Sequence, residues 1–132
     1  MGLQNSIAVI GSGYVGTVVA ACMATLGHDV VGVEIDRTKL ELLRNGNAPF
    51  FEPGLEHRLR DAVDSGRLLF TDDFDLALER SEVVFLCVDT PPGENGHPNT
   101  SSVAAAARAL GKAMYKPCLL YTSPSPRDLR QD

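Results

Sequence analysis

The chain has 132 residues, of which 44% are hydrophobic and 22% charged, and its formal net charge is -5. This length suits one domain with a buried core. The negative charge, and the lack of any cluster of lysine and arginine, argue against a nucleic-acid-binding protein. The first residues, MGLQNSIAVIG, have no basic segment ahead of a long apolar core, so we expect no membrane span and a cytoplasmic location.

The first motif in the chain is the turn GSGYVG, from Gly11 to Gly16. It follows the apolar run 7–10, which predicts a buried strand, and leads into the proline-free run 15–26, which predicts a helix. In this setting Gly11 permits a tight turn, Gly13 leaves room for a pyrophosphate, and Gly16 lets the helix pack closely on the strand. The helix would direct its free N–H groups and its positive dipole end at that anion.

An acidic residue stands where such a site needs one. Glu34 lies eighteen residues after Gly16, at the end of a second apolar run, 30–33. A carboxylate at this point accepts hydrogen bonds from the adenosine ribose hydroxyls of a dinucleotide. The alternative is an ordinary surface acid at a strand end. Because a carboxylate repels a 2′-phosphate at close range, we expect NAD as the cofactor in preference to NADP.

The rest of the chain alternates helices with strands. We expect helices over 39–44, 55–65, 74–79 and 102–113, and further strands over 68–71 and 83–88. The unbroken apolar run 83–88 suits a central strand of a parallel sheet. The pattern predicts an α/β fold, a truncated Rossmann-type doubly wound parallel sheet with strand order 3-2-1-4. The turn after 83–88 then lies on the same edge of the sheet as the glycine turn.

The residues from Cys118 onward differ in character from those before them. The string CLLYTSPSPRD fits neither a buried strand nor a helix over its length, and it is similar to the translation of a transposon-based sequencing adapter. We therefore expect residues 1–117 to form an incomplete NAD-binding domain and residues 118–132 to be an adapter-derived artefact; the alternative is a genuine C-terminal tail. Without further strands, 83–88 would be an exposed and aggregation-prone edge, although residues 119–122 are apolar enough to cover it.

Three segments together carry a family resemblance. They are GYVG within the glycine turn, EPGL from Glu52 to Leu55, and the V-x-T-P pattern from Val88 to Pro91, which continues as PPGENG. With them the chain resembles the N-terminal domain of the UDP-glucose/GDP-mannose dehydrogenase family over about residues 7–114, and within it most nearly the bacterial UDP-glucose 6-dehydrogenases. The resemblance implies a nucleotide-sugar substrate that is oxidised at its C6 hydroxymethyl group by two NAD.

The resemblance also implies which residues bind the cofactor. The glycine turn would surround the pyrophosphate, Glu34 would take the ribose position, Lys39 would lie near the adenosine half, and the turn after 83–88 would border the nicotinamide ribose. The implied cofactor-binding residues are Gly11, Gly13, Tyr14, Val15, Gly16, Glu34, Lys39, Val88, Asp89, Thr90 and Pro91. Asp89 stands where the family more often has Gly or Asn, which leaves its own contact open.

No stretch of the chain matches the segment that holds the catalytic cysteine in this family. We therefore expect an N-terminal fragment that is inactive alone, with no catalytic and no metal-binding residue, whose nucleotide sugar would bind through missing domains. The full-length enzyme is expected to be a homodimer. Two alternatives stay open: another NAD-dependent dehydrogenase of similar fold, and a non-catalytic nucleotide-binding module.

Overall fold

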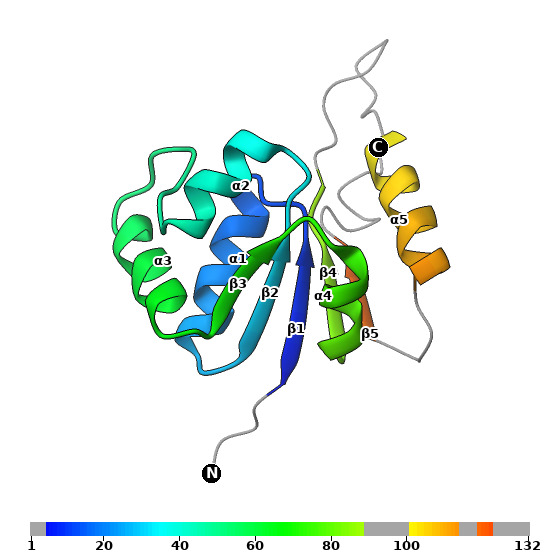
Figure 1. The fold of residues 1–132 in the computed structure, drawn as a ribbon, viewed down its shortest axis with the longest axis horizontal. Helices are drawn as coiled ribbons and strands as arrows, with labels where there is room; N and C mark the ends of the chain where they lie inside the picture. The colour runs from blue at the N-terminus through cyan, green and yellow to red at the C-terminus, as the bar shows by residue number, and fades with distance from the viewer. Residues whose placement is uncertain (1–4, 89–100, 114–118, 123–132) are drawn as a thin grey trace, which may run out of the picture.

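The structure is a computed structural model, and it describes residues 5–88, 101–113 and 119–122 (Figure 1). Strands and helices alternate along most of this part of the chain. The strands are β1 (Ser6–Ile10), β2 (Asp29–Val33), β3 (Leu68–Thr71), β4 (Val83–Leu86) and β5 (Leu119–Thr122). The helices are α1 (Tyr14–Thr25), α2 (Arg37–Arg44), α3 (Leu55–Asp64), α4 (Phe74–Arg80) and α5 (Ser101–Ala113).

The strands form one parallel sheet in the order β3-β2-β1-β4-β5. Its first four strands confirm the α/β fold and the order 3-2-1-4 that the sequence predicts. Strand β1 lies between β2 and β4, with Ile7 opposite Val30 on one side and Val83 on the other. Since all strands run the same way, their carboxyl ends share one edge, where ligands of such folds bind.

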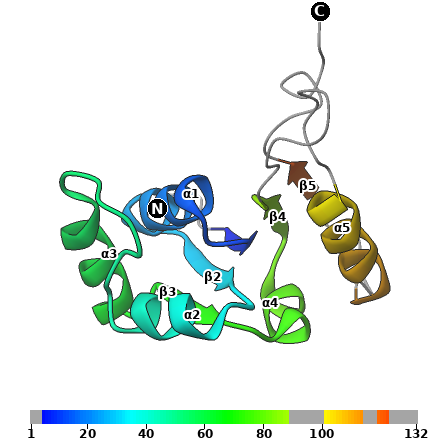
Figure 2. The ribbon, with the colours of Figure 1, turned by 90° about the horizontal axis from the view of Figure 1, so that it is seen from above.

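Helices cover both faces of the sheet, as Figure 2 shows for α1 and α3 on one side and α4 and α5 on the other. Two clusters of buried apolar side chains fill the layers between them. One joins β1, β2 and β3 to α1, α2 and α3, and it includes Phe70, Leu40 and Leu59. The other joins β1, β2 and β4 to α4 and includes Ile10 and Leu78. Because both faces are covered, the strands read as continuous apolar runs in the sequence.

Two aspartates set the starts of helices. The side chain of Asp36 accepts hydrogen bonds from the backbone N–H groups of Thr38 and Lys39, and that of Asp73 accepts one from Leu76. These bonds satisfy N–H groups that have no acceptor within the helix. Helix α2 consequently begins at Arg37, two residues before the start that apolar spacing predicts.

Strand β5 pairs with β4 in parallel, with Val83 opposite Leu119 and Leu86 opposite Thr122. In the 132-residue chain β4 is therefore an inner strand, and the exposed edge expected for a sheet of four strands is not what the structure shows. The pairing segment is the one that the sequence marks as apolar enough for this position. Strand β4 is also shorter than the apolar run 83–88, since regular pairing ends at Leu86.

Candidate functional site

At two positions, one in the turn after β1 and one in the first turn of α1, only glycine fits without a clash with the backbone. Gly11 has φ +95°, and a Cβ atom there would lie 2.7 Å from the carbonyl oxygen of Cys87. A Cβ atom on Gly16 would lie 1.9 Å from the carbonyl oxygen of Gly11. Real Cβ atoms do not approach backbone this closely. A side chain at Gly11 would therefore push the turn away from the end of β4, and one at Gly16 would push α1 away from the turn.

The N-terminus of α1 is open to an anion. Gly13 is the N-cap residue and offers no side chain to the helix, and the first turn contains no acidic residue. The first backbone bond of the helix runs from the N–H of Thr17 to the carbonyl of Gly13. The N–H groups of Tyr14, Val15 and Gly16 precede it, so no carbonyl within the helix can accept from them. These groups and the helix dipole favour a phosphate at this point.

Glu34 links the glycine turn to the segment that follows β2. Its side chain is buried, at 8% exposure, and both carboxylate oxygens accept hydrogen bonds from the backbone. Oε1 accepts from the N–H of Ser12 at 3.3 Å, and Oε2 accepts from the N–H of Asp36 at 2.9 Å. A carboxylate has about four acceptor positions, so roughly two remain for the vicinal hydroxyls of a ribose.

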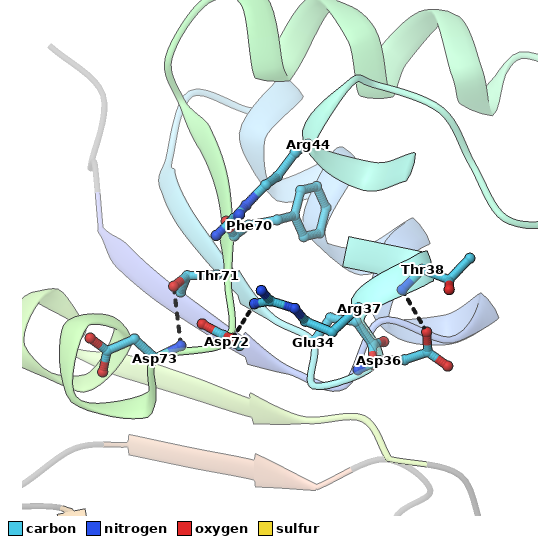
Figure 3. Close-up of polar contacts among 9 residues, drawn as sticks. All are labelled: Glu34, Asp36, Arg37, Thr38, Arg44, Phe70, Thr71, Asp72 and Asp73. Atoms are coloured by element: carbon cyan, nitrogen blue, oxygen red, sulfur yellow. Dashed lines mark hydrogen bonds and ion pairs between the residues drawn. The ribbon is translucent and has the colours of Figure 1, made fainter. Parts of the chain in front are cut away.

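The neighbouring ends of β2 and β3 are held by further polar contacts, which Figure 3 shows around Glu34. Arg37 pairs with Asp72 at 3.2 Å on the exposed surface, and Nε of Arg44 donates to the carbonyl of Phe70 at 3.1 Å. The N–H of Glu34 donates to the carbonyl of Thr71 at 2.9 Å. The Glu34 carboxylate is thus fixed by its own backbone as well as by the groups that donate to it.

A cavity of about 400 Å³ opens at this edge of the sheet. It lies within the range of volumes typical of small-molecule sites. The cavity is lined by Ile10, Gly11, Ser12, Gly13, Val33, Glu34, Ile35, Lys39, Phe74, Cys87, Val88, Ala105, Ala106 and Ala109. One carboxylate and one ammonium group stand among apolar walls, which suits a ligand with a flat apolar part and a polar sugar. Burial raises the pKa of the Cys87 thiol to about 11.

The predicted cofactor-binding residues divide into three groups. Gly11, Gly13, Glu34, Lys39 and Val88 line the cavity together. Tyr14, Val15 and Gly16 do not line it, and the side chains of Tyr14 and Val15 are about half exposed. Asp89, Thr90 and Pro91 lie outside the residues that the structure describes.

Sequence analysis missed the apolar walls. Ile35 follows β2, Phe74 begins α4 and Cys87 follows β4. The remaining wall residues, Ala105, Ala106 and Ala109, come from α5. Cys87 is a small buried residue, with 5% exposure. Its place at the cavity follows from the pairing of β4 with β1, since the N–H of Cys87 donates to the carbonyl of Ile10 at 2.7 Å. The signal in the sequence that could have placed Cys87 at the cavity is its position directly after the apolar run of an inner strand.

A comparison with protein families decides the relationship. The family described as the UDP-glucose/GDP-mannose dehydrogenase family, NAD binding domain, matches residues 5–124. The chain belongs to this family. The family relationship and the cofactor, NAD, that the sequence predicts are both confirmed.

Individual members of the UDP-glucose/GDP-mannose dehydrogenase family are similar over most of the chain. A UDP-glucose 6-dehydrogenase of Pseudomonas aeruginosa is 46% identical over 114 residues, which are 86% of this chain and 25% of that protein. A UDP-glucose 6-dehydrogenase of Rhizobium meliloti is 50% identical over 105 residues, 79% of this chain and 24% of that protein. The chain thus spans about a quarter of the length of these relatives.

Solved structures of family members share the fold. A GDP-mannose dehydrogenase from Pseudomonas aeruginosa, solved as a ternary complex, superposes with a TM-score of 0.83 at 36% identity, over 89% of this chain and 28% of that one. A UDP-glucose dehydrogenase from Pyrobaculum islandicum gives a TM-score of 0.79 at 41% identity, over 84% of this chain and 26% of that one. No helix among residues 5–88, 101–113 and 119–122 is long and apolar enough to cross a membrane.

Proposed function

We propose that this chain binds NAD in the cavity at the carboxyl edge of its sheet. The observation that carries the proposal is the buried carboxylate of Glu34, which forms part of the cavity wall together with Gly11 and Gly13. In this arrangement the adenosine ribose lies at Glu34 and the pyrophosphate lies over the N-terminus of α1. The residues fit the cofactor, because a ribose acceptor, an anion-binding helix end and apolar walls for a base are adjacent.

The contacts proposed for each part of the cofactor follow from this arrangement. Backbone N–H groups of the turn that contains Gly13, Tyr14, Val15 and Gly16 donate to the pyrophosphate. The ammonium group of Lys39 adds positive charge at the adenosine end of the cavity. Val88 borders the side toward the nicotinamide ribose, and the same role for Asp89, Thr90 and Pro91 rests on the resemblance alone.

We infer that the chain is the N-terminal part of a nucleotide-sugar 6-dehydrogenase, with UDP-glucose as the substrate of the whole enzyme. The support is the identity of 46–50% to two UDP-glucose 6-dehydrogenases, of which the chain covers about a quarter. When bound, the nicotinamide supplies hydride acceptance, and the residues of this chain bind and orient the cofactor. A cytoplasmic location, a homodimeric full-length enzyme and a role in polysaccharide biosynthesis belong to the same proposal.

The binding proposal is tested by titrating the chain into NADH and NADPH and following the fluorescence of the reduced nicotinamide. We expect weak but saturable binding of NADH and clearly weaker binding of NADPH, because Glu34 would face the 2′-phosphate. NAD should also raise the midpoint of thermal unfolding, as any ligand does that binds only the folded state. Equal affinity for the two dinucleotides would contradict the assigned role of Glu34.

The proposal for the whole enzyme is tested in the source DNA. Sequencing across codon 118 shows whether the natural reading frame departs from CLLYTSPSPRD. A frame that continues into a segment resembling GGSCFPKD, the type that holds the catalytic cysteine in this family, supports a nucleotide-sugar dehydrogenase. A natural stop codon shortly after codon 117 would instead favour a non-catalytic nucleotide-binding module.

A further inference from the structure

The loop between α2 and α3 is attached to the first turn of α1. The hydroxyl of Tyr14, the first residue of α1, donates a hydrogen bond to Oε2 of Glu52 at 2.9 Å. The ring of Tyr14 also contacts that of Phe50, with centroids 5.1 Å apart and planes inclined at 48°. One side chain of the glycine turn therefore makes both a polar and an aromatic contact with a loop that lies 36 to 38 residues further along the chain.

The loop residues in these contacts are themselves anchored. The carbonyl of Glu52 accepts a hydrogen bond from the N–H of Leu55 at 3.1 Å, and Leu55 begins α3 with its side chain in the core at 5% exposure. Phe50 packs against the same core cluster. The bond between Tyr14 and Glu52 thus connects the N-terminus of α1 to the start of α3, whose first side chain is buried in the core.

Neither side chain belongs to the cavity wall. Tyr14 and Glu52 are absent from the lining, whereas Gly13, which directly precedes Tyr14, is part of it. The hydrogen bond to Glu52 raises the pKa of the Tyr14 hydroxyl above its ordinary value, so the hydroxyl stays protonated and able to donate at neutral pH. A carboxylate close to the helix N-terminus would by its charge alone oppose the binding of a second anion there.

We propose that Glu52 is a positioning residue for the dinucleotide: through Tyr14 it fixes the first turn of α1, whose N–H groups take the pyrophosphate in the proposed function on which this inference rests. Fixing that turn in advance lowers the cost of ordering it when the dinucleotide binds. The EPGL segment, which otherwise has no role in the site, acquires one through its first residue.

The test is a double-mutant cycle on the 132-residue chain, with NADH affinity measured by fluorescence titration and folding by thermal unfolding. The variants are Tyr14→Phe, Glu52→Ala and the two combined. We expect each single change to weaken NADH binding by about three- to tenfold, the range for one positioned hydrogen bond. The double variant should bind no more weakly than the weaker single variant, since both changes remove the same bond.

Two further variants separate positioning from charge. Glu52→Gln keeps an oxygen that can accept from Tyr14, so it should bind NADH within about twofold of the unchanged chain. Glu41→Ala removes an exposed carboxylate of α2 and should leave the affinity unaltered. If Glu52 acts only as a nearby negative charge, Glu52→Ala will tighten NADH binding, the gain will shrink with added salt, and Tyr14→Phe will have no effect. That result overturns the inference.

A purely structural role has a different signature. If Glu52→Ala and Tyr14→Phe lower the midpoint of unfolding yet leave NADH affinity unchanged in the folded protein, the bond stabilises the loop without positioning the turn, and the inference is wrong. If the unchanged chain does not bind NADH at all, the proposed function fails and this inference fails with it. The unchanged chain distinguishes the two failures: it binds NADH if only this inference fails, and it does not bind NADH if the proposed function fails.

Discussion

The carboxylate of Glu34 and the backbone N–H of Ser12 are joined by a hydrogen bond of 3.3 Å that crosses from the end of β2 to the turn after β1. The bond is buried, and the same turn is also tied to β2 by the N–H of Gly11, which donates to the carbonyl of Val33 at 2.9 Å. The group proposed to recognise the ribose therefore also helps to shape the turn proposed to receive the pyrophosphate. Changing Glu34 alters both.

Replacement of Glu34 by alanine should weaken NADH binding by about 10- to 100-fold, since hydrogen bonds to a charged acceptor contribute about 1.5–3 kcal/mol. The affinity ratio of NADH to NADPH should narrow as well, because the charge that opposes the 2′-phosphate is gone. The ratio is the more informative measurement: damage to the turn lowers both affinities, whereas loss of ribose recognition changes the ratio. Fluorescence titration with each dinucleotide gives it.

Asp72→Asn is the matched control for Glu34→Ala. Asp72 is a carboxylate at the end of the neighbouring strand β3, is paired with Arg37 on the exposed surface and does not line the cavity. Exposed ion pairs contribute about 0–1 kcal/mol, so this change should lower stability little and leave the ratio of affinities unaltered. A Glu34→Ala variant that keeps the original ratio would contradict ribose recognition by this residue.

Gly16→Ala should unfold or severely destabilise the chain. Its Cβ atom would lie 1.9 Å from the carbonyl oxygen of Gly11, so α1 must shift away from the ends of β1 and β4. Gly111→Ala provides the comparison, because a Cβ atom there has no neighbour within 4 Å and the residue lies in α5. Alanine in that helix should stabilise the fold by about 0.5–1 kcal/mol. Thermal or urea unfolding of both variants measures the two opposite effects.

The thiol of Cys87 should react slowly with iodoacetamide at neutral pH and faster as the pH approaches 11. Burial raises its pKa to about 11, and the thiolate is the reactive form. A raised pKa also means that the folded state holds this proton more tightly than the unfolded chain does. The contribution of this proton to the free energy of unfolding is therefore fully present below about pH 8.5 and is lost as the pH rises through about 11.

Mass spectrometry of the modified peptides separates Cys87 from the other two cysteines, Cys22 and Cys118. Because Cys87 lines the cavity, bound NADH should slow its modification further. Rapid modification of Cys87 at pH 7 in the folded protein would show that its surroundings are less enclosed than the structure indicates.

The sequence predicts the parts of this molecule that depend on local chemistry. The glycine turn and Glu34 are found from spacing, because a tight turn and a carboxylate at a strand end are properties of a few neighbouring residues. The walls formed by Ile35 and Phe74 are not found, since apolar residues look alike in a sequence whether they face the core or a cavity. The bond between Tyr14 and Glu52 joins residues 38 positions apart and is set by how the loop packs.

The edge of the sheet beyond β4 also could not be predicted from the local sequence. An apolar run at 83–88 indicates burial, and it does not say which segment pairs with the strand. Residues 119–122 have the apolar character needed for that position, and the structure pairs them with β4. The origin of residues 119–122 does not decide whether they can pair with β4, because backbone pairing depends on hydrogen-bonding groups that every segment without proline carries. That residues 118–132 derive from an adapter stays a prediction.

Removal of residues 118–132 should destabilise the protein and promote aggregation. Without Leu119–Thr122, the strand Val83–Leu86 presents unpaired N–H and C=O groups along an apolar edge, which can pair with other chains. We expect the 1–117 chain to unfold on the order of 5–10 °C lower than the 132-residue chain, or without a cooperative transition, and to scatter light at lower concentration.

A chain that ends at residue 124 is the control, since it retains β5 and loses only residues that follow it. It should unfold like the 132-residue chain. If the 1–117 chain instead gives an equally sharp transition and is stabilised by NAD to the same degree, β5 contributes nothing to the fold and four strands suffice to hold the cofactor site. The 1–124 and 132-residue chains share every strand of the sheet. A midpoint of unfolding for the 1–124 chain between those of the other two chains would therefore assign part of the stability to residues beyond β5.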